Sequence, residues 1–369
     1  MVSKIIITVL SVSGITGFLA LILVIAEKIF ADYGVCKVNI NGEEDIEVDG
    51  GKSLLFALKE KKIFIPSACG GRGTCGYCKV RVIDGAGPLL PTEEPMLSKD
   101  EMKNNMRLAC QVKVKKDIQI QIPEELFNIK EYKTNLALLK DLTYDIKLLH
   151  LELIEPKEIN FKAGQYVQLE TKPYGDIKET VMRAYSICSP SYEKNYIELM
   201  IRRVPDGICT TWVHDFLKEG EVLNIIGPMG EFYLREGESD IYLIAGGSGM
   251  APIVSILYHI LHEKIERNVL FFFGARTTKD LFYLDVMEYF EQNIPNFKFI
   301  PALSAATNKD KWEGEKGRIT DVINKYIKDR DNSQAQGYLC GSPGMVKACI
   351  NVLNSNNITN DRIFYDPFA

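Results

Sequence analysis

The sequence predicts a multidomain chain that combines α+β and α/β folds behind a single transmembrane helix, and three observations predict this class. A run of 22 residues without a charge lies near the N-terminus, from Ile5 to Ala26. Three of the nine cysteines fall within ten residues, between Cys69 and Cys78, which indicates a metal site. The last third of the chain alternates strand-like with helix-like stretches, which is typical of a parallel sheet covered by helices on both faces.

Length and composition limit the number of domains and the class of protein. At about 100–200 residues per domain, 369 residues predict two or three domains. With 46% hydrophobic and 25% charged residues the composition is that of a globular protein, which excludes disorder, collagen and coiled coil as descriptions of the whole. The net charge of −5 and the absence of a long basic run argue against a nucleic-acid partner. An odd number of cysteines in so long a chain argues against a disulfide scaffold.

The N-terminal apolar run predicts a membrane anchor within residues 1–30. At about 1.5 Å per residue, the 22 residues reach roughly 33 Å, enough to cross the hydrocarbon core of a bilayer. A cleaved signal peptide is the alternative, but its apolar region is usually about 7–15 residues long and follows several basic residues, whereas only Lys4 stands here. The flanking charges are too few to orient the helix. The nucleotide-binding motifs described below place the bulk of the chain in the cytoplasm.

The segment 31–128 has a small α+β pattern. Val38 and Ile40 alternate with polar residues up to Asn41-Gly42, a dipeptide that favours a hairpin turn. Ser53 stands where the N-cap of a short leucine-rich helix is expected. Alternating aliphatic residues follow the cysteines and predict further strands.

Two more segments complete the chain. Residues 129–236 are dominated by strand-like runs that glycine and proline interrupt, which predicts an antiparallel barrel. Those runs are 146–154, 164–170, 196–204 and 221–227. Residues 237–369 predict a parallel α/β domain. Its expected strands are 240–247, 268–275, 297–303, 336–341 and 362–366, with helices from Pro252, near Asp285 and from Met345.

The cysteine motif carries the strongest chemical signal. Five, two and 31 residues separate Cys69, Cys75, Cys78 and Cys110. Four thiolates can hold a 2Fe-2S cluster, and the glycines between them allow backbone N–H groups to approach its sulfurs. Structural zinc also accepts four thiolates, but its cysteines usually come as two close pairs, and here the fourth stands alone. We therefore favour an iron–sulfur cluster over zinc.

A second set of motifs lies in the barrel segment. We predict that Arg183-Ala184-Tyr185-Ser186 forms a strand, which places alternate side chains on one face. Gly207, Thr210 and Thr211 follow, just before the helical run WVHDFL, and amides at a helix start suit a pyrophosphate. Taken alone, these are ordinary strand and helix residues. Their order along the chain is what favours a flavin site.

The third set of motifs lies in the α/β segment. Gly246, Gly247, Gly249 and Pro252 follow a predicted strand, where glycine allows a phosphate to approach the backbone. The loop lacks the third glycine of the Rossmann spacing. Two further strand ends carry candidate residues, which are Arg276, Cys340 and Gly341. A buried strand cysteine is the alternative interpretation of Cys340, and we interpret Cys36, Cys188 and Cys349 as structural.

The ordered motifs RAYS, GGSGMAP, GART and YLCG resemble the ferredoxin–NADP reductase superfamily. With the anchor and the five-residue first gap of the cysteine motif, nearly the whole chain resembles the F subunits of sodium-translocating NADH:quinone reductases. The resemblance implies a β-grasp ferredoxin domain with a 2Fe-2S cluster, an FAD-binding barrel and an NAD-binding domain. It also implies that Cys340 and Gly341 lie beside the nicotinamide, and that a C-terminal aromatic residue, Phe368 or else Tyr365, covers the flavin ring.

The function implied by the resemblance is electron transfer from NADH to FAD and then singly through the cluster. The acceptors would be membrane subunits of a quinone-reductase complex and finally quinone, with any sodium export carried out by those partners. Within the active site, Ser186 and Cys340 are the expected polar contacts, while Arg183 would neutralise pyrophosphate and Tyr185 would pack on the flavin. We favour NADH over NADPH because Arg276 is followed by no dense basic cluster, Lys279 being interpreted as paired with Asp280.

Two alternatives of different classes remain compatible with these residues. One is the reductase component of an iron-dependent oxygenase, which shares the three domains. The other is a non-catalytic, membrane-tethered electron carrier with a decayed nucleotide domain. The anchor argues against the first, and the intact glycine motifs argue against the second.

Overall fold

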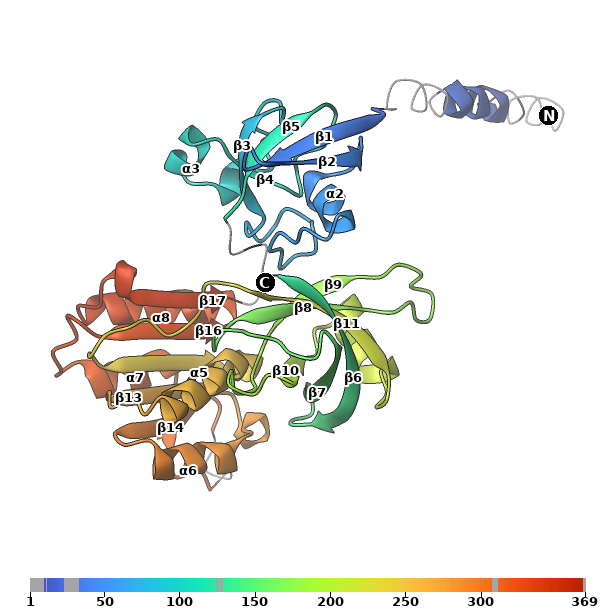
Figure 1. Ribbon diagram of the computed structural model, residues 1–369. Coiled ribbons are helices and arrows are strands. Elements are labelled where there is room, and N and C mark those ends of the chain that lie inside the picture. The colour runs from blue at the N-terminus through green and yellow to red at the C-terminus, as the bar shows by residue number, and fades with distance from the viewer. Residues whose placement is uncertain are drawn as a thin grey trace, which may run out of the picture. The chain divides into compact units, whose positions relative to one another are not determined.

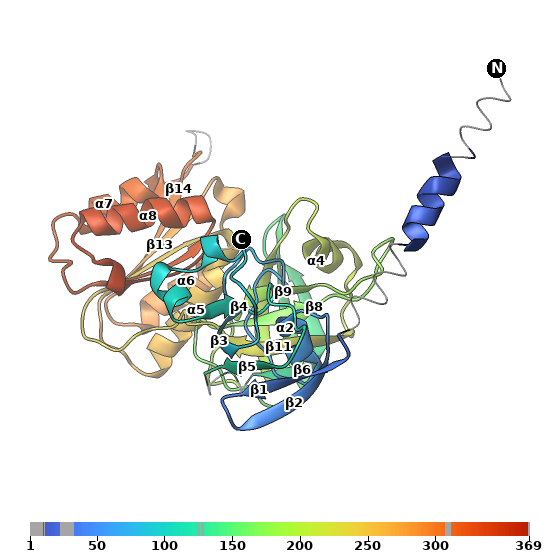
Figure 2. The ribbon, with the colours of Figure 1, turned by 90° about the horizontal axis from the view of Figure 1, so that it is seen from above.

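The structure is a computed structural model that describes residues 10, 12–22, 33–123, 126, 129–306 and 311–367. The chain divides into two compact units (Figure 1, Figure 2). Unit 1 comprises Met1–Ser67 and Gly71–Phe127, and unit 2 comprises Ala68–Gly70 and Asn128–Ala369. Unit 2 thus contains both segments that carry the nucleotide motifs.

Unit 1 contains one mixed sheet of five strands. The strands are β1 (Val35–Ile40), β2 (Glu44–Asp49), β3 (Lys79–Asp84), β4 (Met106–Leu108) and β5 (Ile118–Gln121), in the order β2-β1-β5-β3-β4. The predicted hairpin of β1 and β2 is confirmed, and its turn residues Asn41 and Gly42 have the positive φ angles of 56° and 79° that such a turn needs. The helices are α2 (Leu54–Glu60), η1 (Glu94–Met96) and α3 (Lys99–Lys103).

Helix α2 supplies part of the core of unit 1. Leu54, Leu55 and Leu58 are buried in one apolar cluster with residues of the sheet. The predicted cap is wrong in detail: Ser53 is the N-cap residue, but its side chain makes no capping hydrogen bond. The buried Ser53 hydroxyl has no partner among the described residues. Packing of the leucines, rather than a cap, therefore stabilises this short helix.

The first part of unit 2 is an antiparallel near-barrel. Its strands are β6 (Lys130–Asp141), β7 (Ile146–Glu155), β8 (Tyr166–Glu170), β9 (Met182–Ser186), β10 (Tyr196–Arg202) and β11 (Val222–Met229). Their order is β10-β7-β6-β11-β8-β9. A bridge between Ile187 and Leu199 joins the chain just beyond β9 to β10, so the two edges of the sheet meet. The short helix α4 (Ile208–Thr211) continues into a π-helical turn, η3 (Trp212–Phe216).

The second part of unit 2 is a parallel α/β sheet, as predicted. The strands β12 (Ile241–Gly246), β13 (Val269–Ala275), β14 (Phe297–Leu303), β15 (Glu315–Lys316), β16 (Gln336–Gly341) and β17 (Ile363–Pro367) have the order β15-β14-β13-β12-β16-β17. Four helices cover it: α5 (Met250–His262), α6 (Leu284–Asn293), α7 (Ile319–Ile327) and α8 (Pro343–Ser355).

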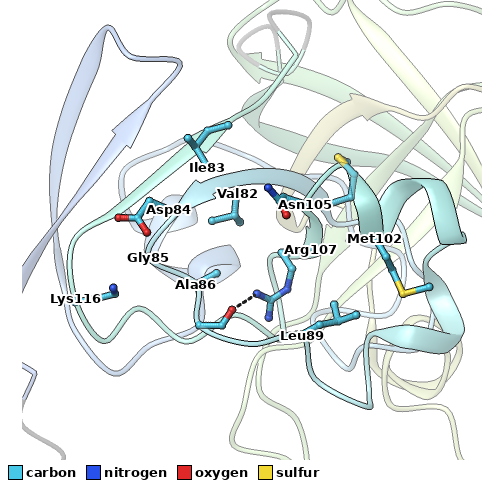
Figure 3. Close-up of a pocket in the computed structure, with 12 residues that line it drawn as sticks. Val82, Ile83, Asp84, Gly85, Ala86, Leu89, Met102, Asn105, Arg107 and Lys116 are labelled. Carbon is cyan, nitrogen blue, oxygen red and sulfur yellow. Dashed lines mark hydrogen bonds between the residues drawn. The ribbon is translucent and has the colours of Figure 1, made fainter.

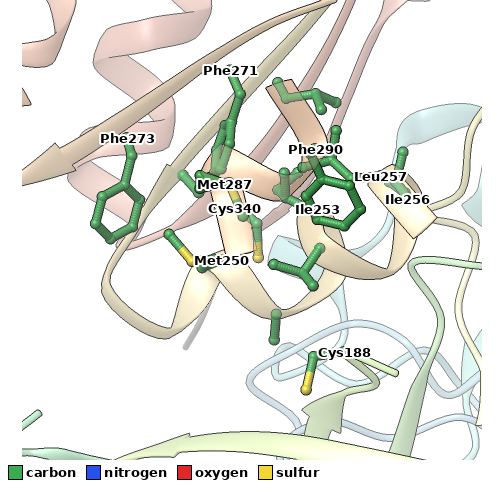
Figure 4. Packing of buried hydrophobic residues seen from close by; sticks show 14 of the residues in the cluster. Cys188, Met250, Ile253, Ile256, Leu257, Phe271, Phe273, Met287, Phe290 and Cys340 are labelled. Carbon is green, nitrogen blue, oxygen red and sulfur yellow. The ribbon is translucent and has the colours of Figure 1, made fainter. Parts of the chain in front are cut away.

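Side-chain alternation divides these helices between the two faces of the sheet. Leu243 and Ala245 belong to the buried cluster of α5 and α6, in which Ile253 packs near Phe271 and Cys340 (Figure 4). Their neighbours in β12, Tyr242 and Ile244, belong instead to the cluster of α7 and α8. Because successive strand residues point to opposite faces, a strand buried on both sides is apolar at every position, as β12 is.

The predicted membrane anchor lies partly outside the described residues. Residues 12–22 form a helix, and its larger apolar side chains, including Ile15 and Phe18, are exposed. Within the portion of the chain that is described, no helix has both the length and the apolar character needed to cross a membrane.

Candidate functional site

The order of the parallel sheet creates a topological switch point at the carboxyl ends of β12 and β16, which we call the crevice. β13 and β14 lie on one side of β12, and β16 and β17 lie on the other, so the chain leaves these two neighbouring strands in opposite directions. Ligands of open α/β sheets bind at such a switch point. Both predicted glycine segments stand there, after β12 and at the end of β16.

Close backbone packing explains the glycines of this crevice. A Cβ atom on Gly249 would lie 2.2 Å from the carbonyl oxygen of Cys340. Gly247 has a φ of 57°, which favours glycine, and Gly341 has a φ of 152°. The predicted residues Gly246, Gly247, Gly249, Cys340 and Gly341 are thus brought together, and Pro252 lies in the first turn of α5.

Cys340 is fully buried, and its thiol already makes a hydrogen bond within the protein. Its Sγ donates a hydrogen bond to the backbone carbonyl of Asp366 in β17, at 3.2 Å. Burial, followed by the nearby charge of Asp366, raises the pKa of the thiol well above its usual value. The raised pKa favours the neutral thiol form of Cys340.

A cavity of about 440 Å³ opens beside the crevice. Of the predicted residues, Gly247 and Arg276 line it. The near-barrel contributes Asp145 and Arg202, whose ion pair has a length of 2.7 Å. Ser342, which directly follows the predicted Cys340-Gly341 pair, also lines the cavity. Other lining residues that the sequence did not indicate are Ser304, Arg318 and Thr320. They lie in loops at strand ends or in the first turns of helices, where no local motif marks them.

The predicted pairing of Lys279 with Asp280 is wrong. The Asp280 carboxylate accepts hydrogen bonds from the Thr277 amide and hydroxyl, at 2.8 and 2.7 Å, and from the Tyr144 hydroxyl at 2.9 Å. The carboxylate caps the η5 turn (Thr278–Asp280) instead of neutralising the lysine next to it. One reason for favouring NADH over NADPH is thereby removed.

The second predicted site begins on β9. Ser186 ends the strand, is buried and lies opposite Tyr166 of β8. Arg183 lies three residues before it and donates to the carbonyl of Met182 at 2.6 Å. Burial raises the pKa of Tyr185 well above its usual value and that of Cys209 to about 11, and the two groups also influence each other's pKa. The β9 motif and the α4 motif therefore lie close to each other.

The loop that begins α4 uses one threonine hydroxyl internally. Thr210 Oγ1 accepts a hydrogen bond from the Val204 amide at 3.1 Å and lies 3.2 Å from the carbonyl of Gly207. A Cβ atom on Gly207 would come within 2.5 Å of the same hydroxyl, which accounts for the glycine. Thr211 donates its backbone N–H to Gly207 at 2.8 Å, and no hydrogen bond of its hydroxyl is found among the described residues.

The cysteine loop has an irregular backbone that glycines permit. Gly70, Gly71, Gly73 and Gly76 have φ angles of 67°, 88°, 77° and 70°, a region that other residues rarely adopt. Three of the cysteines, Cys69, Cys78 and Cys110, are buried, and Cys75 is half-buried. The backbone thus turns repeatedly around the thiols without a helix or strand.

The thiols are only partly gathered. Across the described residues, no group of three or more histidine, cysteine, aspartate or glutamate side chains is placed to hold a metal ion. The thiols of Cys78 and Cys110 are hydrogen-bonded to each other, and this contact, together with burial and the nearby Cys75, raises the pKa of Cys78. Four thiols around a glycine-rich turn still match the chemistry of an iron–sulfur cluster, whose ligands are thiolates and whose sulfurs accept backbone N–H groups.

Comparison with family models assigns a type to each segment. Residues 38–115 match a 2Fe-2S iron-sulfur cluster binding domain, residues 133–233 an oxidoreductase FAD-binding domain, and residues 243–350 an oxidoreductase NAD-binding domain. The chain is also 34% identical to the F subunit of the Na(+)-translocating NADH-quinone reductase of Psychrobacter cryohalolentis, and the alignment covers 96% of each chain. The chain belongs to the family of these F subunits. The F subunit of Haemophilus ducreyi is 35% identical, over 96% of this chain and 98% of its own.

Solved structures share this architecture. A cytochrome P450 reductase of Amycolatopsis, GcoB, aligns with a TM-score of 0.72 and 28% identity over 90% of this chain and 98% of its own. A ferredoxin reductase in carbazole 1,9a-dioxygenase aligns with a TM-score of 0.69 and 26% identity over 91% and 98%. The resemblance to the F subunits is confirmed by their full-length match, and the chain is an oxidoreductase with 2Fe-2S, FAD and NAD domains.

One predicted residue stays outside this account. Phe368 lies beyond the described residues. The fallback candidate, Tyr365, lies on β17 and is 54% exposed. β17 pairs with β16, and its last residue, Pro367, lies opposite Gly341.

Proposed function

We propose that this chain takes electrons from NADH and passes them, through FAD and a 2Fe-2S cluster, to membrane subunits of a quinone reductase and finally to quinone. The observation that carries the proposal is the full-length match to the F subunits of such reductases, with the three domains in the order found here. When bound, FAD takes the hydride of nicotinamide as an electron pair and releases single electrons, which the cluster carries one at a time. Any sodium export belongs to the partners.

The cavity beside β12 supports binding of the dinucleotide. Arg202 and Arg276 supply positive charge at its walls, and Gly247 lets a phosphate approach the backbone. Arg202 also neutralises Asp145, so one acidic wall residue does not repel the phosphates. As the family resemblance implies, the fully buried Cys340 would lie beside the nicotinamide.

The residues of β9 and α4 are proposed to hold FAD. Arg183 would pair with the pyrophosphate and Tyr185 would pack on the flavin, with Ser186 offering its hydroxyl to the flavin edge. Since the Thr210 hydroxyl is bonded within its own loop, Thr211 is the better candidate for a contact with the pyrophosphate. No side chain needs to donate a proton to a substrate in this half-reaction, so catalysis depends on placement.

Cys69, Cys75, Cys78 and Cys110 are the proposed ligands of the cluster. The loop of left-handed glycines around them would present backbone N–H groups to the sulfurs, and such contacts set the potential of a cluster. The thiols would lose their protons on binding iron, because the charge of the metal favours the thiolate form.

The N-terminal segment Ile5–Ala26 is the proposed single-pass anchor, with the bulk of the chain in the cytoplasm. Its support is the uncharged run and the exposed apolar side chains of the described helix at residues 12–22. A variant that lacks residues 1–30 should leave the membrane fraction while keeping NADH oxidation with an artificial acceptor. If that variant sediments with membranes as the parent does, the anchor is not in this segment.

The test of the whole proposal is purification from membranes. We expect the chain to co-purify with membrane subunits, to contain iron and a flavin, and to support NADH:quinone activity measured with and without sodium. Anaerobically prepared protein that contains zinc instead of iron, or no flavin, would overturn the proposed relay.

A second function, the reductase component of an oxygenase, is favoured by the two aligned structures, a cytochrome P450 reductase and the reductase of a dioxygenase system. Neighbouring genes separate the two functions. Genes for membrane quinone-reductase subunits support the first, and a gene for an iron hydroxylase or a P450 supports the second.

A further inference from the structure

We propose that Gln111 raises the reduction potential of the cluster through a hydrogen bond from its side-chain amide to the sulfur of Cys110. The inference rests on the proposed function, in which Cys110 is a cluster ligand. Gln111 Nε2 lies 3.6 Å from Cys110 Sγ and is the donor of this bond. Gln111 is adjacent to its target in sequence, so its reach depends on how the side chain is held.

Thr92 fixes the direction of the amide. Its hydroxyl donates to Gln111 Oε1 at 3.0 Å, which leaves the NH₂ group for the sulfur. The opposite orientation would turn the carbonyl oxygen toward a thiolate, and two acceptors repel each other. The cluster loop also makes room for this amide, because a Cβ atom on Gly73 would lie 2.6 Å from Nε2.

The segment that carries Thr92 is held by a buried ion pair. Glu93 is 0% exposed and Arg107 is 6% exposed, and Nη2 and Oε2 lie 2.6 Å apart. Glu93 Oε1 also accepts the amide of Leu108 at 2.9 Å, two residues before Cys110. Arg107 further donates to the carbonyl of Gly87 at 3.0 Å, on the wall of a cavity of about 380 Å³ (Figure 3). Thr92 and Cys110 are therefore anchored to the same rigid pair.

A bond from a neutral N–H to a ligand sulfur favours the reduced cluster. Reduction adds one negative charge, which spreads onto the sulfurs, so a donor stabilises the reduced form more than the oxidised form. The bond is partly shielded from water, since Cys110 is only 8% exposed. Loss of the donor should therefore make the cluster harder to reduce.

The experiment is a redox titration of the full-length chain followed by the electron paramagnetic resonance signal of the reduced cluster. Gln111→Met keeps the length of the side chain and removes the donor. We expect its reduction to be about tenfold less favourable, which is about 59 mV for one electron, toward more negative potential. Thr92→Val should give a smaller shift of the same sign, and Thr92→Ser should titrate as the parent does.

Gln121→Met is the matched control. Gln121 is an exposed glutamine of β5 in the same unit, where its Oε1 accepts a bond from Arg81 at 3.3 Å. The Gln121→Met variant should leave the reduction potential of the cluster unchanged.

Two results would overturn the proposal. One is a parental potential in both Gln111→Met and Thr92→Val. The other is loss of iron from Gln111→Met combined with a parental potential in Thr92→Val, which would make Gln111 an assembly residue. A parent chain without iron would instead overturn the cluster itself, and the iron content of the parent distinguishes that failure from these two.

Discussion

Ser186 tests the flavin site at the level of a single hydroxyl. Ser186→Ala should slow reduction of the bound flavin by NADH by about tenfold, because one hydrogen bond is worth roughly 0.5–1.5 kcal/mol and 1.4 kcal/mol is tenfold in rate. The affinity for NADH should change little, since the hydroxyl is expected to contact the flavin and not the dinucleotide. Stopped-flow measurement of flavin bleaching over a range of NADH concentrations separates the two quantities.

Ser189→Ala is the matched control for Ser186→Ala. Ser189 is also buried, three residues further on, and its hydroxyl accepts the amide of Glu198 at 3.2 Å. Its loss should reduce stability without changing the rate of flavin reduction. Equal rates in Ser186→Ala and the parent would remove Ser186 from the site.

The sequence predicted where the motifs lie among the strands and helices, whereas it did not predict the directions of side chains. Thr210 lies at the start of a helical stretch and Cys340 near the end of a strand, as predicted. The structure shows that the hydroxyl of Thr210 is bonded within its own loop and that the thiol of Cys340 is bonded to the Asp366 carbonyl. Asp366 is distant from Cys340 in sequence, and the bond of Thr210 depends on the turn that precedes it. The spacing of residues in the sequence therefore does not reveal either hydrogen bond. Gln111 was missed for the same reason, because its contact with Cys110 depends on Thr92.

At the scale of elements, the junction of η4 (Gly247–Gly249) with β16 is sterically tight. Gly249 has a φ of −61°, which any residue can adopt, so the glycine is needed for space and not for conformation. Gly249→Ala would place a methyl group against the backbone of Cys340. We expect a loss of roughly 1–3 kcal/mol in stability and weaker NADH binding, measured by urea unfolding and by titration with NADH.

Gly344→Ala is the control for this change. Gly344 lies in the first turn of α8, and a Cβ atom there meets nothing within 4 Å. Alanine should leave stability unchanged or raise it by up to about 1 kcal/mol. If Gly249→Ala were as stable as Gly344→Ala, the close contact at the crevice would be wrong.

The loop before η1 is tied to β4 by the Glu93–Arg107 pair, which makes unit 1 sensitive to acid. Burial alone would raise the pKa of Glu93, but hydrogen bonds from Arg107, Leu108 and Leu90 outweigh burial and lower it. A lowered folded-state pKa gives stability that is complete above the unfolded value of about 4.3 and is lost as the pH falls through the folded value.

Glu93→Gln should therefore destabilise unit 1 by about 3 kcal/mol at pH 7, because Arg107 is left buried and unpaired. The deficit should shrink as the pH falls below about 4, where the parent loses the same charge. Calorimetric unfolding from pH 7 down to about pH 3 measures both effects. Glu101→Gln, which breaks the half-exposed pair with Lys79 at 2.7 Å, should cost less than about 1 kcal/mol. Comparable losses in the two variants would contradict the role of burial.

Two elements show why parts of the fold escaped prediction. In β6, Tyr132, Thr134 and Leu136 point inward in strict alternation, but one of the three is polar and the outward positions are mostly charged. Thr134 is satisfied by the carbonyl of Leu223, a bond across strands that the sequence does not display. In contrast, α7 buries Ile319, Val322, Ile323 and Ile327 at a helical spacing, so the signal was present and was overlooked.

For the whole molecule, the division into two units predicts that the two half-reactions are separable. Three of the four proposed cluster ligands, Cys75, Cys78 and Cys110, lie in unit 1, whereas Cys69 and the flavin and dinucleotide motifs are assigned to unit 2. Cys78→Ser should abolish the iron–sulfur signal and the transfer of electrons to quinone. Reduction of the flavin by NADH should proceed at the parental rate, because no described residue of the dinucleotide crevice depends on that thiol.

Cys36→Ala is the control for this separation, since Cys36 is a buried cysteine of β1 in the same unit and no proposed ligand. Its loss should cost stability while iron, flavin reduction and quinone reduction persist. The informative ratio is the rate of flavin bleaching divided by the rate of quinone reduction. This ratio should rise sharply in Cys78→Ser and stay constant in Cys36→Ala. If flavin bleaching fell together with the cluster signal in Cys78→Ser, the two units would not work as independent stages, and electrons would not move from one to the other in the proposed order.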